Sequence, residues 1–165
     1  MSGTDTRRPA LGTNAIDPEL LGTVFCELME TVALLCGEPI PKDDLDPDEC
    51  GGIRLSIRFK GERSGYLAWF LHRQTGERIA GNVLGLDVED TYNRLCASET
   101  LKELTRNLCG QVLEAVFGCE RDYELSETDL ERSTADEWQD VIDSAHGLCY
   151  RIDGEPVIVR FHAED

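Results

Sequence analysis

The sequence lacks the long apolar stretches that mark membrane and secreted proteins. No run approaches the roughly 18 apolar residues that a membrane-spanning helix needs, and the first residues, MSGTDTRRPALGTNA, contain no apolar core of a secretion signal. We therefore expect a chain that does not enter a membrane and that works in the cytoplasm.

Paired cysteine motifs are also absent. Seven cysteines occur, an odd number, and none forms a CxxC pair. This spacing excludes the common zinc-binding and thioredoxin-like motifs. Most of the cysteines lie within apolar patterns, where a reduced cysteine behaves as a small hydrophobic residue. The pattern indicates free thiols in a reducing compartment.

Signals for a phosphate loop, a catalytic triad or a metal site are missing. The glycines of GNVLG lack the Walker lysine and the dinucleotide-binding pattern. The three histidines lie far apart and have no nucleophile motif beside them: His72, His146 and His162. Carboxylates at 43, 44, 46, 48 and 49 raise calcium as an alternative, but the loop has prolines and lacks EF-hand spacing. We expect no metal and no cofactor.

Positive charge is scarce. Lysine and arginine number 16 against 33 acidic residues, for a formal net charge of -17. Phosphate groups would be repelled by this excess, which argues against nucleic acid and an anionic membrane surface as partners. A basic or mixed-charge protein patch remains open as a partner. For most of the carboxylates, solubility is a sufficient explanation.

The remaining composition predicts a folded globule of 165 residues, 41% of them apolar. Residues 1–15 are expected to form a flexible tail, and 16–165 a single domain. Asp17 and Pro18 are typical of a helix start, and apolar spacing carries that helix to about Cys36, with Gly37 as its end. An acidic, proline-bearing loop is expected over 38–51.

An alternating apolar segment at 53–60 and a more fully apolar one at 66–72 then predict a hairpin. A short helix at 74–84 should end at Gly85, a polar connection covers 86–93, and a second long helix runs from about Ser98 to Phe117. A short strand near 122–126, an acidic stretch, a short helix near 134–145 and a hairpin over 148–161 complete the chain. This order indicates α+β architecture: an antiparallel-rich mixed sheet, with strands pairing mainly with sequence neighbours, packed against two long helices and shorter ones.

The long helix has an unusual polar flank. At about 100° per residue, apolar residues such as Leu104 and Leu108 face the core, whereas the opposite side carries six residues: Thr100, Glu103, Asn107, Gly110, Gln111 and Glu114. Glu103 and Asn107 are i,i+4 neighbours. A mid-helix glycine costs roughly 1 kcal/mol against alanine, and close approach by another surface is one reason for it. Taken alone, such residues are usually just solvated.

The order of elements adds a resemblance over about two thirds of the chain. Three segments carry it, in this order: Ile79-Ala80-Gly81-Asn82-Val83-Leu84-Gly85, Glu103-Leu104-Thr105-Arg106-Asn107-Leu108-Cys109-Gly110, and the hairpin at Gly154-Glu155-Pro156-Val157. Together they resemble the CheC/CheX family of chemotaxis phosphatases. In that family the second motif reads E-(L/I)-x-N-(M/I)-x-x-G. The resemblance implies a CheC/CheX-like fold, and a homodimer.

One departure concerns the spacing, which is ExxN in the family and ExxxN here. Aligning on Asn107 puts Leu104 in the position of the glutamate, and aligning on Glu103 puts Arg106 in that of the asparagine. Because Glu103 and Asn107 share the exposed flank while Leu104 points into the core, we take Glu103 and Asn107 as the matching pair.

The resemblance implies a phosphatase that hydrolyses the aspartyl-phosphate of a CheY-type response regulator. Asn107 would position the attacking water and Glu103 would pair with a cation of the partner, with any metal ion supplied by the partner. Thr100, Gly110 and Gln111 would contact that partner. The alternatives are a catalytically inactive CheX-like binding or dimerisation module, and an unrelated acidic α+β protein. Cys109 is expected to be inert, Trp69 a core residue, and Trp138 either a core residue or a binding anchor.

Overall fold

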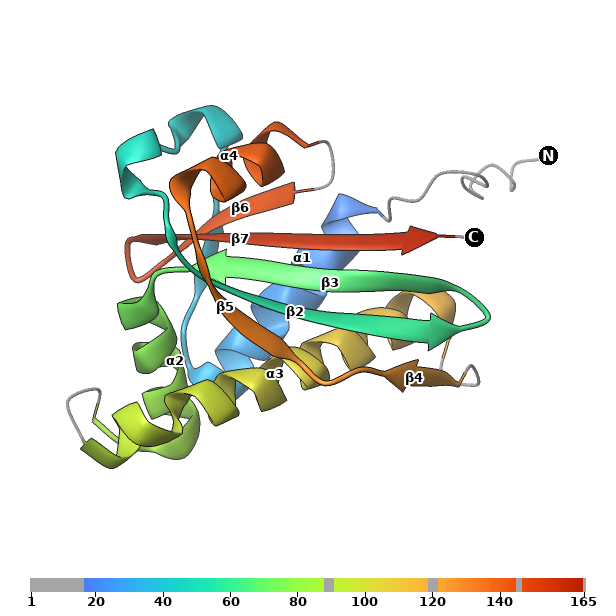
Figure 1. Ribbon diagram of the computed structural model, residues 1–165, viewed down its shortest axis with the longest axis horizontal. Coiled ribbons are helices and arrows are strands. Elements are labelled where there is room, and N and C mark those ends of the chain that lie inside the picture. Colours follow the sequence, from blue (N-terminus) through green and yellow to red (C-terminus); the bar gives the residue numbers. More distant parts are fainter. Residues whose placement is uncertain (1–16, 88–90, 119–121, 145–146, 165) are drawn as a thin grey trace.

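The fold is taken from a computed structural model that describes residues 17–87, 91–118, 122–144 and 147–164 (Figure 1). The tail expected at 1–15 and His146 lie outside the described residues. The helical elements are α1 Pro18–Leu28, the π-helical turn η2 Met29–Ala33, the 3-10 turns η3 Lys42–Asp44 and η4 Pro47–Glu49, α2 Arg73–Leu84, α3 Thr91–Phe117 and α4 Ala135–Asp143. The strands are β1 Gly37–Pro39, β2 Gly52–Gly61, β3 Ser64–Leu71, β4 Tyr123–Leu125, β5 Asp129–Ser133, β6 Gly147–Ile152 and β7 Glu155–Glu164.

All the described strands belong to a single antiparallel sheet in the order β1-β6-β7-β3-β2-β4, with β5 also paired to β2. β4 and β5 occupy two successive stretches of the same edge of β2. The β6–β7 hairpin turns at Asp153 and Gly154, which both have positive φ, as a two-residue type I′ turn requires. The expected α+β class with an antiparallel-rich sheet is confirmed.

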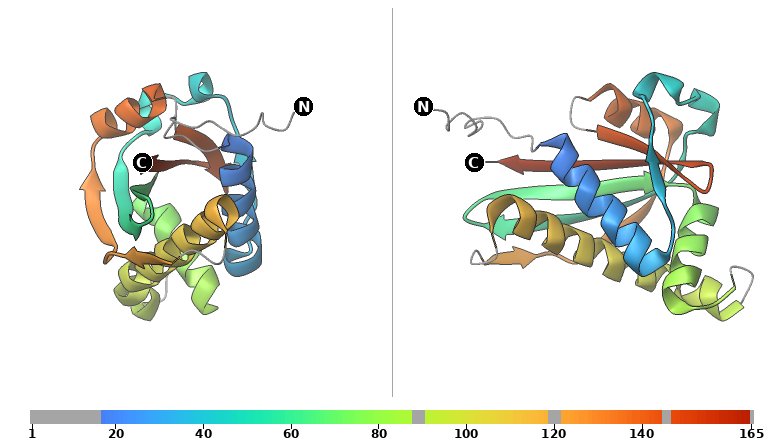
Figure 2. Two further views of the ribbon diagram at one scale, coloured as in Figure 1. Left: turned by 90° about the vertical axis from the view of Figure 1, so that its right-hand side faces the viewer. Right: turned by 180° about the vertical axis from the view of Figure 1, so that it is seen from behind.

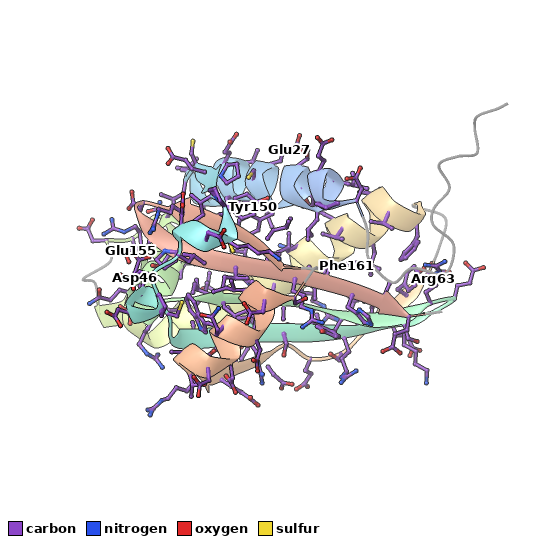
Figure 3. All side chains as sticks on the ribbon, turned by 90° about the horizontal axis from the view of Figure 1, so that it is seen from above. Glu27, Asp46, Arg63, Tyr150, Glu155 and Phe161 are labelled. Atoms are coloured by element: carbon purple, nitrogen blue, oxygen red, sulfur yellow. The ribbon has the colours of Figure 1, made fainter. Side chains whose placement is uncertain are left out.

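Helices cover both faces of this sheet. Seen along the sheet edge in Figure 2, α1 and α3 lie on one side of the strands and α4 on the other. α3 packs against α1, α2 and β2, and α4 against β6 and β7. In the view from above, Asp46 and Glu155 lie at one end of the molecule and Arg63 at the other (Figure 3).

The core is correspondingly divided in two. The larger cluster lies under α1 and α3 and contains Trp69 and Phe25, which meet edge to face at 5.9 Å between ring centroids. The smaller cluster lies under α4 and contains Trp138 and Phe70. Both tryptophans are fully buried. Trp69 is thus a core residue as expected, and Trp138 is a core residue rather than an exposed binding anchor.

Five predictions from the sequence need correction. The first helix ends in the π-helical turn with Leu34 in the left-handed region, three residues before Gly37. α3 begins at Thr91 rather than near Ser98, because the polar segment before Ser98 has no apolar period to reveal it. The expected loop contains β1, and the acidic stretch after β4 contains β5, both short polar edge strands. Finally, β3 pairs with β7 and β1 with β6, so several pairings are not between sequence neighbours.

Candidate functional site

The polar flank of α3 is built on a well-anchored apolar side. Leu101, Leu104, Leu108 and Val112 are at most 2% exposed and pack into the larger core cluster. Beneath the flank, the buried Thr105 hydroxyl accepts a hydrogen bond from Trp69 Nε1 at 2.9 Å and donates one to the Leu101 carbonyl at 2.7 Å. Buried polar groups that are paired in this way fix one arrangement. The helix is therefore a rigid support for the residues on its outer side.

Glu103 and Asn107 are both exposed on that outer side. Their i,i+4 spacing makes them neighbours on the helix surface. In the part of the chain that the structure describes, neither side chain has a hydrogen bond or an ion pair to another residue. Leu104, the alternative occupant of the glutamate position, is buried as the helical count predicted. A carboxylate and a carboxamide thus lie next to each other on the helix surface, exposed to solvent and without a bonding partner among the described residues.

The other residues expected on this flank are at its surface. Gln111 is exposed, and Thr100 and Gly110 are half-buried. A Cβ built onto Gly110 would meet no atom within 4 Å. Close packing within the chain therefore does not require this glycine, and its cost to helix stability, about 1 kcal/mol relative to alanine, is not offset by any contact of the described residues. That these five residues form one functional site stays a prediction.

The segment between β4 and β5 borders the flank on one side. The Arg106 guanidinium donates a hydrogen bond to the Ser126 carbonyl at 2.9 Å, and the Thr128 hydroxyl donates to the Lys102 carbonyl at 3.2 Å. Arg106 is exposed but tethered, unlike Glu103 and Asn107. This contrast matters because Arg106 is the residue that falls in the asparagine position when the motif is aligned on Glu103.

Cys109 and the two described histidines, the other candidate nucleophile and bases, have different surroundings. Cys109 is fully buried, and its burial raises the pKa of the thiol to about 12, an effect that the nearby Arg106 only partly opposes. A thiol in that state is not a nucleophile at neutral pH. His72 contacts Glu155 and stacks on Trp138, and His162 of β7 lies against Tyr66 of β3. Neither histidine adjoins Cys109 in the described contacts.

The acidic loop over 38–51 does not gather its carboxylates. Two 3-10 turns, η3 and η4, form this stretch, and Leu45 between them is buried in the smaller core cluster. Among the described residues, no group of three or more His, Cys, Asp or Glu side chains is placed to hold a metal ion. None of the helices in the described ranges is long and apolar enough to cross a membrane.

One feature of the outer sheet face was missed by the sequence analysis. A hollow of about 670 Å³ lies between α4 and the β4–β5 segment, and Arg54, Arg58 and Arg160 line it. On β2, Arg54 and Arg58 alternate with core residues, and this segment was predicted only as one strand of a hairpin. The grouping of the three arginines becomes apparent only once β7, about a hundred residues later in the sequence, is known to pair with β3 in the same sheet.

Comparison with known proteins gives a consistent picture of the fold. Neither a protein-family profile nor a curated protein matches the sequence. A structure of the chemotaxis protein CheX from Desulfovibrio desulfuricans matches with a TM-score of 0.63 at 13% identity, over 88% of this chain and 97% of that one. CheX from Vibrio vulnificus matches with a TM-score of 0.63 at 11% identity, over 89% and 95%.

A third solved structure is that of a complex of CheX, CheY, BeF3 and Mg2+ from Borrelia burgdorferi. It matches with a TM-score of 0.61 at 11% identity, over 89% of this chain and 97% of that one. Because these identities are low, the likeness concerns the arrangement of elements rather than individual residues. The chain therefore has the fold of the CheX and CheC-like chemotaxis proteins, as its sequence motifs indicated.

Proposed function

We propose that this protein is a phosphatase of a CheY-type response regulator, and that it hydrolyses the regulator's aspartyl-phosphate with the flank of α3. The proposal rests on one observation: Glu103 and Asn107 are exposed and have no bonding partner among the described residues, while the buried side of their helix is bonded to the sheet through Thr105 and Trp69. The fold supports it, and the complex of CheX with CheY among the matching structures supports a CheY-like receiver as the partner.

The chemistry demands little of the enzyme, because an acyl phosphate is already reactive. Water attacks phosphorus, the bond between phosphorus and the aspartyl oxygen breaks, and inorganic phosphate and a free carboxylate leave. Asn107 suits the positioning step because a carboxamide both accepts and donates hydrogen bonds. Its oxygen would hold the water in line while its amide nitrogen donates to a phosphoryl oxygen. Positioning of this kind supplies most of the rate in phosphoryl transfer.

Glu103 would act as the anchor. A carboxylate one turn from Asn107 would form a charge-assisted hydrogen bond with a cationic side chain beside the partner's phosphoryl group. Gly110, with open space above it, would let the partner's backbone approach the helix. Thr100 and Gln111 would complete the contact at either end. The metal ion of the reaction, on this proposal, belongs to the receiver.

A second candidate is a binding module without catalytic activity, and one observation favours it. Glu103 and Gly110 are seven residues apart, the spacing of the family motif, and this alignment puts Arg106 where the asparagine belongs. A guanidinium has no acceptor and cannot hold a water through its lone pairs. Arg106 is moreover tethered to the Ser126 carbonyl. A protein aligned in this way would bind a receiver and leave its phosphate intact.

The rate at which a phosphorylated receiver loses its phosphate distinguishes the phosphatase from the binding module. We expect wild-type protein to accelerate the loss, Asn107→Ala to reduce the acceleration about 100-fold, and Glu103→Ala to weaken it mainly through affinity. Glu27→Gln is the matched control, since Glu27 is an exposed carboxylate on α1 that points away from the sheet (Figure 3). An acceleration that survives Asn107→Ala would refute the site.

Arg106→Asn decides between the two alignments. This variant restores the ExxN spacing on an exposed position, so its folding should be unaffected apart from loss of the bond to Ser126. If wild-type protein binds a beryllofluoride-loaded receiver without accelerating phosphate loss, and Arg106→Asn gains that activity, the binding module is correct. If wild-type protein is active and Arg106→Asn adds nothing, the Glu103–Asn107 pair is supported.

A further inference from the structure

The hollow on the outer face of the sheet has a floor of small side chains. Ser56 on β2, Ala68 on β3 and Arg160 on β7 form one cross-strand row, because Ser56 pairs with Ala68 and Ala68 with Arg160. Neighbouring rows carry Phe70 and Tyr66 on the middle strand. The two small side chains therefore leave a depression between larger neighbours. Residues of α4 also line it, and α4 covers the face of the sheet opposite α1 and α3 (Figure 2).

Three guanidinium groups surround this depression. Arg54 and Arg58 lie on β2, two residues before and after Ser56, and Arg160 lies across the floor on β7. Basic residues are outnumbered about two to one in this chain, so three of them around one hollow is a local concentration of positive charge. Guanidinium groups bind phosphate and carboxylate in bidentate fashion, with strong charge-assisted hydrogen bonds.

The chain does not use these groups fully for its own structure. Arg54 pairs with Glu131 of β5, and the Arg160 guanidinium lies over the Tyr66 ring at 5.6 Å. Within the described ranges, no ion pair joins Arg58 or Arg160 to a carboxylate. The Nε atoms of Arg54 and Arg160 are buried and have no hydrogen-bond partner among the described residues. Buried donors without a partner are costly, which favours an acceptor from outside the chain.

The rim of the hollow has the opposite charge. Four carboxylates line it, from the β4–β5 segment and from α4: Glu127, Asp129, Glu137 and Asp140. Carboxylates accept hydrogen bonds and repel anions. A ligand that fits both parts carries one anionic group for the floor and hydroxyl or amino donors for the rim. The volume of about 670 Å³ is within the range of ligand pockets.

We propose that this hollow binds a small organic phosphate, with its phosphoryl group on Arg54, Arg58 and Arg160 and its hydroxylated body against the carboxylate rim. A sugar phosphate and a nucleoside monophosphate share this chemistry. An acidic peptide fits less well, because its several carboxylates would meet the four on the rim. This site is independent of the phosphatase proposal, since it lies on the sheet face opposite α3.

Titration calorimetry with four probes tests the proposal: ribose 5-phosphate, adenosine 5′-monophosphate, inorganic phosphate and ribose. We expect saturable binding of at least one organic phosphate, at least tenfold tighter than inorganic phosphate, and none of ribose. Adenosine monophosphate binding tighter than ribose 5-phosphate identifies a nucleotide, and the reverse identifies a sugar phosphate. Inorganic phosphate binding as tightly as both, or no saturable binding of either organic phosphate, overturns the proposal.

Substitutions place the binding in the hollow. Arg58→Gln and Arg160→Gln should each weaken binding about tenfold or more, the effect of removing one charge-assisted hydrogen bond. Arg132→Gln, the same change at an exposed position of β5 outside the hollow, should have no effect. Ala68→Leu fills the floor without changing charge and should abolish binding. Because Arg58 is exposed, its variant keeps the test valid even if Arg160→Gln unfolds. Binding unchanged by Arg58→Gln and Ala68→Leu refutes the site.

Discussion

A buried hydrogen bond joins Trp69 of β3 to Thr105 of α3, and Thr105→Val tests how much it contributes to the attachment of α3 to the sheet. Both residues are fully buried, and the Thr105 hydroxyl accepts from Trp69 Nε1 and donates to the Leu101 carbonyl. Valine has nearly the same shape and a similar helix propensity, so the substitution removes the hydroxyl and little else. It leaves the Trp69 N–H buried without an acceptor.

The expected cost follows from that orphaned donor. An unsatisfied buried group costs about 1–3 kcal/mol, whereas an ordinary hydrogen bond contributes only about 1 kcal/mol. We therefore expect Thr105→Val to lower the free energy of unfolding by about 1–3 kcal/mol. For a chain of this length each kcal/mol corresponds to about 2–4 °C in Tm. Urea titration followed by tryptophan fluorescence measures the change.

Two controls separate the hydrogen bond from packing. Thr105→Ser keeps the hydroxyl and loses one methyl group, so it should cost only about 1 kcal/mol. Trp69→Phe removes the donor as well, and in the double variant the loss should be smaller than the sum of the two single losses. If Thr105→Val is as stable as wild type, or if the two changes are additive, the bond does not hold α3 and the rigid-support argument fails.

Three further predictions follow from single positions. Gly110→Ala should raise the free energy of unfolding by about 1 kcal/mol in urea titration, since its Cβ meets open space, yet weaken receiver binding if the partner's backbone approaches there; unchanged binding would contradict that contact. Leu34→Asn should stabilise the protein by about 0.5–1 kcal/mol, because Leu34 has positive φ and is 73% exposed, and lower stability would show that its side chain makes contacts. Burial raises the pKa of the Cys109 thiol from 9.0 to about 12, so ionisation favours the unfolded chain. The free energy of unfolding should therefore fall as pH rises between those two values. Cys109→Ala should make this fall less steep, and identical pH profiles of stability for the variant and the wild type would refute the argument.

The sequence predicted the faces of α3 correctly because its apolar period is regular. Leu104 and Leu108 are buried and Glu103 and Asn107 exposed, as the helical count requires. Two local signals at helix ends were also informative: Asp17 caps α1, and Gly85 ends α2 in the left-handed conformation. Such signals are local and can be read from a single sequence, although Gly37, predicted to end the first helix, does not do so, because Leu34 is its C-cap.

The errors in strands and strand pairing arose where neighbours in space, not in sequence, decide the structure. β5 has the sequence DLERS and pairs with β2 only along an edge, so no alternation of burial marks it. The placement of β7 beside β3 depends on burial of both of its faces, which the sequence shows only as a run of apolar residues. The arginine-lined hollow could not be predicted for the same reason.

The sheet keeps the two proposed sites apart, yet one segment touches both. The Ser126 carbonyl accepts from Arg106 beside the α3 flank, and the Ser126 hydroxyl accepts from the backbone N–H of Arg58 at the hollow. Sites that share no packing partner usually contribute additively to stability, whereas a shared partner couples them. The stability changes caused by Asn107→Ala and Arg160→Gln should therefore be additive in the double variant. Those caused by Arg106→Ala and Ser126→Ala should not be additive, because both substitutions act on the shared segment. Additivity of that second pair as well would show that Ser126 carries no connection between the two faces.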